Sequence, residues 1–167
     1  MAASGALATI AQLAMAVTGF AGLLTVFRSS RRRWHEIELV ALRFLLMTSI
    51  SACLLSLLPL ILLEAPDSRS VPWRVCQSAL GVWLLFLFIW QHRQERLKGL
   101  RPRSPAINAA MWVVGIAIAL ANIAAAARLT AALSPAAVYL IGLFWLLLGA
   151  ILQFVVQIIS SVSVDAK

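Results

Sequence analysis

The sequence predicts an all-α integral membrane protein: a bundle of five transmembrane helices with the N-terminus outside and the C-terminus in the cytoplasm. Of the 167 residues, 62% are hydrophobic and only 12% are charged, and the mean hydropathy is +0.95. Soluble domains are roughly 45–50% apolar and about 25% charged. Several uncharged segments reach the roughly 18 apolar residues that cross a hydrocarbon core. The connections between them are short, so we expect a single transmembrane domain over 1–167.

The first predicted span covers 6–27 and contains no charged residue. It is followed at once by a cluster of arginines, which holds that end of the span on the cytoplasmic side and leaves the N-terminus outside. A cleavable signal peptide would carry basic residues before its apolar run. None precedes this span, so we favour a retained helix over cleavage near Ala16. The arginines of the cluster are Arg28, Arg31, Arg32 and Arg33.

Small residues recur along the first span at helical spacing. In lipid, where apolar burial gives helices little reason to associate, such a stripe lets another backbone approach closely. We predict that the stripe packs on a neighbouring helix, with a ligand or pore lining as the less favoured alternative. The residues are Ala11, Ala14, Thr18 and Ala21, with Gly19 and Gly22 nearby.

The second span is predicted at 44–63, after a basic cytoplasmic stretch at 28–43 in which a helix begins near Trp34. Pro59 has no backbone N–H, so the carbonyl of Leu55 loses its usual helical partner. We expect a kink here, with the hydroxyl of Ser56 helping to satisfy the freed carbonyl.

The third span is predicted at 75–91, after an outer loop over 64–72 that contains two prolines. Its brevity suggests local thinning of the bilayer, or snorkelling of Arg74 and His92 towards water at its two ends.

A second basic stretch, 92–105, returns the chain to the cytoplasmic side. Of the 14 lysines and arginines in the chain, this topology leaves only Arg69, Arg74 and Arg128 outside, which is a strong positive-inside pattern. Anionic lipid head groups explain the net charge of +8, and we expect no nucleic-acid partner. The basic residues of this stretch are Arg93, Arg96, Lys98, Arg101 and Arg103.

The fourth and fifth spans are predicted at 106–127 and 136–160. Each follows a Ser-Pro pair, Ser104-Pro105 or Ser134-Pro135, which places an N-cap oxygen beside a proline at the first helical position. In the alternative interpretation, these two spans are joined, or part of this alanine-rich region is buried in the membrane without forming a separate span.

The interiors of the five spans contain no aspartate, glutamate, lysine, arginine or histidine. Ion-coupled transport and proton relays usually need an ionisable group at membrane depth. Intramembrane hydrolysis needs a catalytic set that is also missing from the sequence. We therefore predict a non-enzymatic protein without a metal or another cofactor.

Neutral polar residues are the remaining candidates. Gln12 and Asn122 are predicted at the same depth, where their amides would form an interhelical hydrogen bond. Polar and small residues also follow one face of the fifth span. We favour helix packing for this face, with a pore lining as the alternative. The face consists of Gly142, Gly149, Gln153 and Gln157, with Ser160 close by.

Several segments of the first half resemble a group of small, uncharacterised bacterial multi-span inner-membrane proteins. They are Thr18-Gly19-Phe20-Ala21-Gly22 leading to Phe27-Arg28, then Trp34, then the stretch from Arg43 to Leu58-Pro59. The resemblance covers roughly 1–60. It implies location in the bacterial inner (cytoplasmic) membrane, and no activity, substrate or site residue.

These features predict a polytopic protein that acts through helix–helix association. We expect a homo-oligomer, or a subunit or regulator of another membrane protein, surrounded by lipids with anionic head groups. The alternative is a passive oligomeric channel lined by the neutral polar residues of the fifth span.

Overall fold

The computed structural model describes residues 2–29, 36–63, 70–97, 105–128 and 134–165, and these ranges contain five α-helices and no strand. All five helices are long and apolar enough to cross a membrane. The predicted all-α architecture with five membrane-length helices is therefore confirmed. The helices are α1 (Ala2–Ser29), α2 (Glu36–Leu63), α3 (Ser70–Leu97), α4 (Pro105–Ala126) and α5 (Pro135–Asp165).

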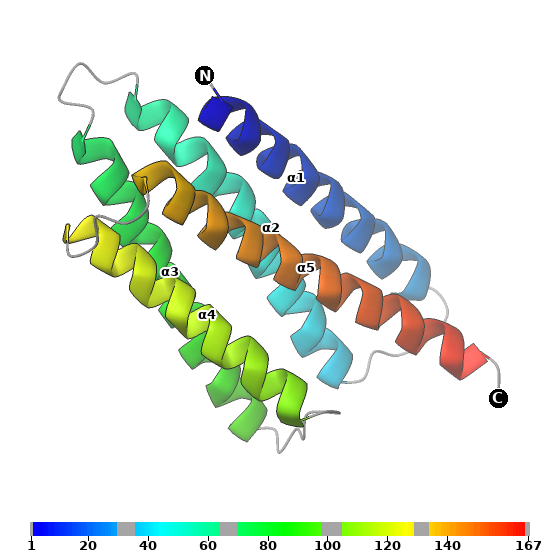
Figure 1. The fold of residues 1–167 in the computed structure, drawn as a ribbon. Coiled ribbons are helices and arrows are strands. Elements are labelled where there is room, and N and C mark those ends of the chain that lie inside the picture. The colour runs from blue at the N-terminus through cyan, green and yellow to red at the C-terminus, as the bar shows by residue number, and fades with distance from the viewer. Residues whose placement is uncertain (1, 30–35, 64–69, 98–104, 129–133, 166–167) are drawn as a thin grey trace.

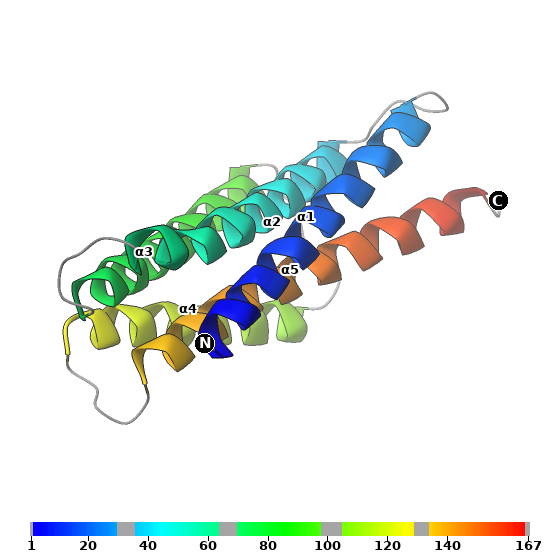
Figure 2. The ribbon, with the colours of Figure 1, turned by 90° about the horizontal axis from the view of Figure 1, so that it is seen from above.

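Helix α5 is the central element, because it contacts each of the other four helices. Helix α1 packs on α2 and α5, and α4 packs on α3 and α5. Among the described residues, α1 contacts neither α3 nor α4, and α2 does not contact α4. The free end of α1 and the free end of α5 lie at opposite ends of the bundle (Figure 1). Viewed from above, α4 and α5 form a layer next to α2 and α3 (Figure 2).

The start of α5 follows the predicted capping pattern. The Ser134 hydroxyl accepts a hydrogen bond from the Ala137 backbone N–H at 3.2 Å, and Pro135 is the first helical residue. Helix α4 likewise begins at Pro105, and Ser104 lies outside the described residues. At the other end of α4, Arg128 takes a left-handed conformation with φ of 60°, as is common just after a helix.

The third helix is longer than predicted. We predicted a short span at 75–91, but α3 has 28 residues, and its membrane-length part runs from Pro72 to Gln94. The prediction placed Pro72 in a loop, although the first turn of a helix tolerates proline because its N–H would have no partner there. This helix needs no thinning of the bilayer. Helix α2 similarly joins the predicted cytoplasmic helix and the span at 44–63 in one element.

The small-residue stripe of α1 packs inside the bundle, as predicted. Ala11, Ala14 and Ala21 are buried. The Thr18 hydroxyl donates a hydrogen bond to Oγ of Ser49 on α2 at 2.8 Å. Close contact between α1 and α2 therefore depends on these small side chains. Two nearby glycines behave differently, because both are exposed and have open space around them: Gly19 and Gly22.

The proline in α2 is compensated by another helix. The Leu55 carbonyl accepts a hydrogen bond from the Tyr139 hydroxyl of α5 at 2.5 Å. Ser56, the donor that we predicted, instead donates to the Ala52 carbonyl at 2.6 Å. A serine hydroxyl within a helix readily reaches the carbonyl four residues back, so it is not available to its neighbour. The unpaired carbonyl was identified correctly, and its donor was not.

Candidate functional site

The predicted polar face of α5 begins with a close contact inside the chain. Gly142 is buried, and a Cβ built on it would lie 2.6 Å from Cδ2 of Leu80 and 3.0 Å from Nδ2 of Asn122. The missing Cβ leaves room on α5 for the side chains of Leu80 from α3 and Asn122 from α4, and a larger residue would require them to shift. This part of the face is a packing contact, in agreement with the favoured interpretation.

Further along α5, the same face opens into a cavity of about 110 Å³ between α2, α3, α4 and α5. Gly149 and Gln153 both line it, and a Cβ on Gly149 would have no neighbour within 4 Å. From Gly142 to Gln153, this face is therefore turned towards other helices of the same chain. Gln157 and Ser160 belong to α5, but their side chains lie outside the described part.

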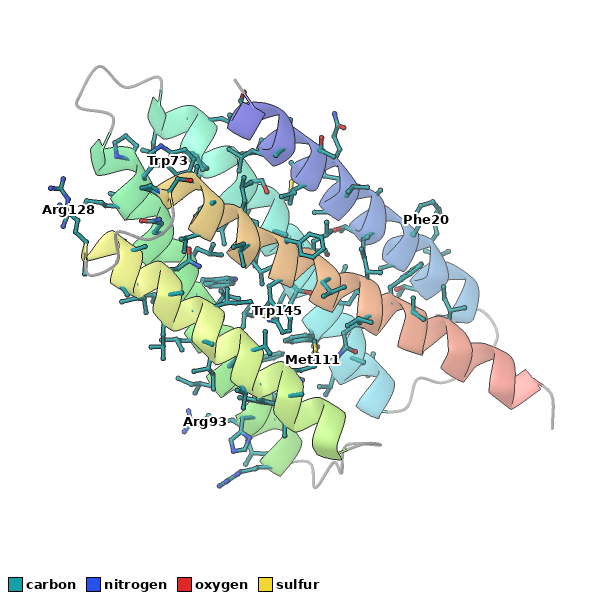
Figure 3. All side chains as sticks on the ribbon, viewed as in Figure 1. Phe20, Trp73, Arg93, Met111, Arg128 and Trp145 are labelled. Atoms are coloured by element: carbon teal, nitrogen blue, oxygen red, sulfur yellow. The ribbon has the colours of Figure 1, made fainter. Side chains whose placement is uncertain are left out.

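Aromatic rings, amides and aliphatic side chains form the cavity wall, and none of the described residues that line it carries a charge. Figure 3 shows Trp145 and Met111 between α4 and α5, in the half of the bundle nearer to Arg93. The rings are Phe44, Phe88, Trp112 and Trp145, and the polar side chains are Thr48, Gln91 and Gln153. The other lining residues are Leu84, Leu87, Met111, Leu146, Gly149 and Leu152.

Neighbouring rings hold one wall of the cavity in place. The Trp112 ring centroid lies 5.3 Å from that of Phe88 and 5.3 Å from that of His92, which meets it edge-on. Phe88 lies directly over Gly115, where a Cβ would come within 2.0 Å of the phenyl ring. This role of Gly115 was not predicted, although a glycine inside an apolar helical run indicates a close contact.

Two polar side chains of the cavity differ in their hydrogen bonding. The Thr48 hydroxyl contacts the carbonyl of Phe44 at 2.9 Å, within its own helix. The Gln153 amide has no hydrogen bond to any other residue in the described part of the chain. A half-buried amide in this position has both its donor and its acceptor available to a ligand or water.

The predicted hydrogen bond between Gln12 and Asn122 is not formed. Gln12 is exposed on α1, which does not contact α4 within the described residues. The Asn122 amide donates instead to the carbonyls of Ile118 at 3.0 Å and Val138 at 3.4 Å. Equal depth does not bring two side chains together unless their helices are neighbours, and the sequence does not show which helices are.

Buried amides connect α3, α4 and α5 in the other half of the bundle. Gln77, which was not among the predicted site residues, donates from Nε2 to the Pro135 carbonyl at 2.9 Å. Both Gln77 and Asn122 are almost fully buried, and the acceptor oxygen of each has no partner in the described structure. Buried water commonly satisfies such groups.

The described basic residues are divided between the two ends of the bundle. Arg28 falls in the last turn of α1, Arg93 and Arg96 lie in the last two turns of α3, and Arg43 lies in the first part of α2. The ends of α1 and α3 and the start of α2 are at the same end of the bundle. Arg128 is at the opposite end (Figure 3), after the last turn of α4, and there Nε of Arg74 donates to the Ala126 carbonyl at 2.9 Å. The other predicted head-group contacts lie outside the described residues: Arg31, Arg32, Arg33, Lys98, Arg101 and Arg103.

Within the described ranges, no group of three or more histidine, cysteine, aspartate or glutamate side chains is placed to hold a metal ion. Both cysteines, Cys53 and Cys76, are free. By length and composition, five helices in the described part of the chain could each cross a membrane, which fits a multi-pass α-helical membrane protein. Comparison with protein-family models, curated proteins and solved structures finds no match.

Proposed function

We propose that this chain is a non-enzymatic protein of the bacterial inner membrane, with its N-terminus outside, that acts through association of α1 with α1 of a second copy. The exposed amide of Gln12 carries this proposal. The amide lies near the middle of the membrane-length part of α1, Ser4–Leu23, and is exposed on the surface of the bundle. It forms no hydrogen bond with another described residue.

An unpaired amide facing hydrocarbon is unfavourable, because the lipid offers no hydrogen-bond partner. A second glutamine side chain supplies both a donor and an acceptor, so a symmetric pair satisfies both copies. Interhelical hydrogen bonds of this kind contribute on the order of 0.6 to 2 kcal/mol in membranes.

The residues around Gln12 favour the close approach of a second helix. They repeat at alternating four- and three-residue spacing, on the side of α1 opposite the buried stripe, and all are exposed. A Cβ on Gly5 or Gly19 would meet nothing within 4 Å. Larger exposed side chains, including Leu13, Met15 and Phe20, flank this line. We call it the outer stripe of α1, and it consists of Gly5, Thr9, Gln12, Ala16, Gly19 and Leu23.

The distribution of basic residues supports the proposed orientation. The ends of α1, α3 and α5 and the starts of α2 and α4 lie at one end of the bundle. Most of the basic residues in the sequence are in or beside the segments at that end. The positive-inside pattern makes this end cytoplasmic.

A disulfide cross-linking experiment tests the association. In a chain with Cys53 and Cys76 replaced by alanine, Ala16→Cys should form a covalent dimer upon oxidation in native membranes. The control is Val113→Cys on α4, which is 68% exposed but far from α1. Adding Gln12→Leu should weaken association about tenfold, from the loss of roughly 1–2 kcal/mol. Equal cross-linking at both cysteine positions would show random collision and contradict the proposal.

The alternative of a channel lined by the fifth span finds less support. Gly142, Gly149 and Gln153 are turned towards helices of their own chain, so they are not positioned around an axis between copies. Association through the outer stripe of α1 leaves this interior face unchanged.

A further inference from the structure

We propose that the cavity between α2, α3, α4 and α5 is a binding site for the ring of a lipid-soluble quinone. The inference concerns binding alone and is independent of the association of α1. Its first support is the size of the cavity, about 110 Å³. An apolar protein cavity of about 150 Å³ accommodates one benzene molecule. This space is smaller, so it encloses part of one ring, with the remainder towards its open side at Leu152, and it excludes a fused polycyclic ligand.

The second support is the absence of charge among the described residues of the cavity lining. A neutral ligand requires no counter-ion there, whereas a carboxylate or an ammonium group would be left without a partner. Four aromatic side chains contribute to the wall, and rings of this kind pack favourably against a flat ligand ring in offset or edge-on geometry. The wall therefore favours a planar, neutral group.

The third support is the presence of amides in the same space. Gln91 and Gln153 come from different helices, and both line the cavity. The Gln153 amide has no hydrogen-bond partner among the described residues. Ring carbonyls are acceptors for amide N–H groups. An acyl chain would fill the space but leave the amide unpaired, which is costly in a partly buried site.

The site also has a preformed wall and a route of entry. Trp112 is held between Phe88 and His92, so the ring does not have to be ordered when the ligand binds. Leu152 lines the cavity and is 43% exposed on the outer surface, so the wall is thin at this point. A quinone ring can enter from the bilayer here while its isoprenoid tail remains among the lipid chains.

A titration of the full chain in lipid nanodiscs tests the site, with a decyl-tailed ubiquinone as the probe. Tryptophan fluorescence should fall in a saturable manner, because Trp112 and Trp145 would contact the quinone. Gly149→Leu should weaken binding about tenfold by filling the cavity, since its side chain enters open space. Gln153→Leu should weaken binding about fivefold by removing the hydrogen-bond donor.

Two controls separate specific binding from other effects. Gly22→Leu places the same side chain at a glycine of α1 that also has no neighbour within 4 Å, and it should bind the quinone as the unmodified chain does. Gln12→Leu should change association and leave quinone binding unaltered, so the two proposals fail separately.

Quenching that rises in proportion to quinone without saturation would overturn the proposal, since it would report partition into lipid alone. Unchanged affinity in Gly149→Leu would also overturn it. Decanol offers the tail without the ring. If decanol displaces the quinone at equal concentration, the cavity takes an alkyl chain, and the assignment to a ring is wrong.

Discussion

At the residue scale, the contact between Tyr139 and Leu55 shows how this bundle tolerates a proline inside a helix. Pro59 is fully buried, and the carbonyl that it leaves without a helical partner receives the hydroxyl of a tyrosine from α5. Tyr139 is itself fully buried and packs edge-on against Trp73, with ring centroids 6.0 Å apart. One side chain thus joins α2, α3 and α5.

We expect Tyr139→Phe to lower the free energy of unfolding by about 1–2 kcal/mol, because the partly buried Leu55 carbonyl loses its donor. The effect should be smaller in a Pro59→Ala background, because the backbone N–H of an alanine at this position can donate to the Leu55 carbonyl within the helix. Unfolding in detergent, measured for both single variants and the double variant, gives the coupling. Equal losses in both backgrounds would mean that the hydroxyl acts independently of the proline.

The sequence could show that Pro59 frees a carbonyl, but not which side chain satisfies it. The first point follows from the covalent structure of proline. The second depends on α5 packing beside α2, a contact between residues far apart in the chain. The prediction that Gln12 pairs with Asn122 failed for the same reason. The sequence predicts how deep each residue lies in the membrane, but it does not show which helices pack against each other.

At the element scale, glycines determine how closely α3 and α4 pack. A Cβ on Gly81 would lie 2.9 Å from the Ala119 carbonyl oxygen, and a Cβ on Gly115 would collide with the Phe88 ring. The small residues that were predicted to matter for packing are in α1 and α5. Those of α3 and α4 form an equally close contact that was not predicted.

Gly115→Ala should destabilise the chain by about 1–3 kcal/mol, because the added methyl group overlaps the phenyl ring of Phe88. Phe88→Leu in the same chain should recover part of the loss by relieving the overlap. The matched control is Gly22→Ala, where the methyl group meets open space and improved helix propensity makes the change neutral or mildly stabilising. Thermal unfolding of the four proteins in one detergent compares them, and equal stability of Gly115→Ala and Gly22→Ala would disprove the close contact.

The spans were predicted well where charge or capping residues bounded them, and poorly where a proline was ambiguous. The Ser-Pro pairs placed the starts of α4 and α5 within one residue, since a cap and a proline together define a helix start. At α3, Pro72 was predicted to end a loop, yet it lies in the first turn of the helix. Local sequence cannot distinguish these two positions for a proline.

At the scale of the whole molecule, the alternating directions of five helices place the two termini at opposite ends of the bundle. The same alternation gathers the ends of α1 and α3, with their arginines, at one end of the bundle, which also contains the candidate quinone cavity. A ligand in this cavity would therefore occupy the half of the bilayer facing the basic side.

We expect a reporter fused to the C-terminus to be active only as a cytoplasmic reporter, and one fused to the N-terminus only as an external one. The physical reason is the cost of moving the arginines across the membrane against the positive-inside bias. Replacing Arg28, Arg31, Arg32 and Arg33 with glutamine removes much of that bias at the first crossing, so a mixed orientation of the N-terminal reporter should follow. The control replaces the three arginines predicted on the outer side, Arg69, Arg74 and Arg128, with glutamine. These substitutions should preserve the orientation. Both reporters on one side of the membrane would require an even number of crossings, and at least one of the five membrane-length helices would then not cross the bilayer.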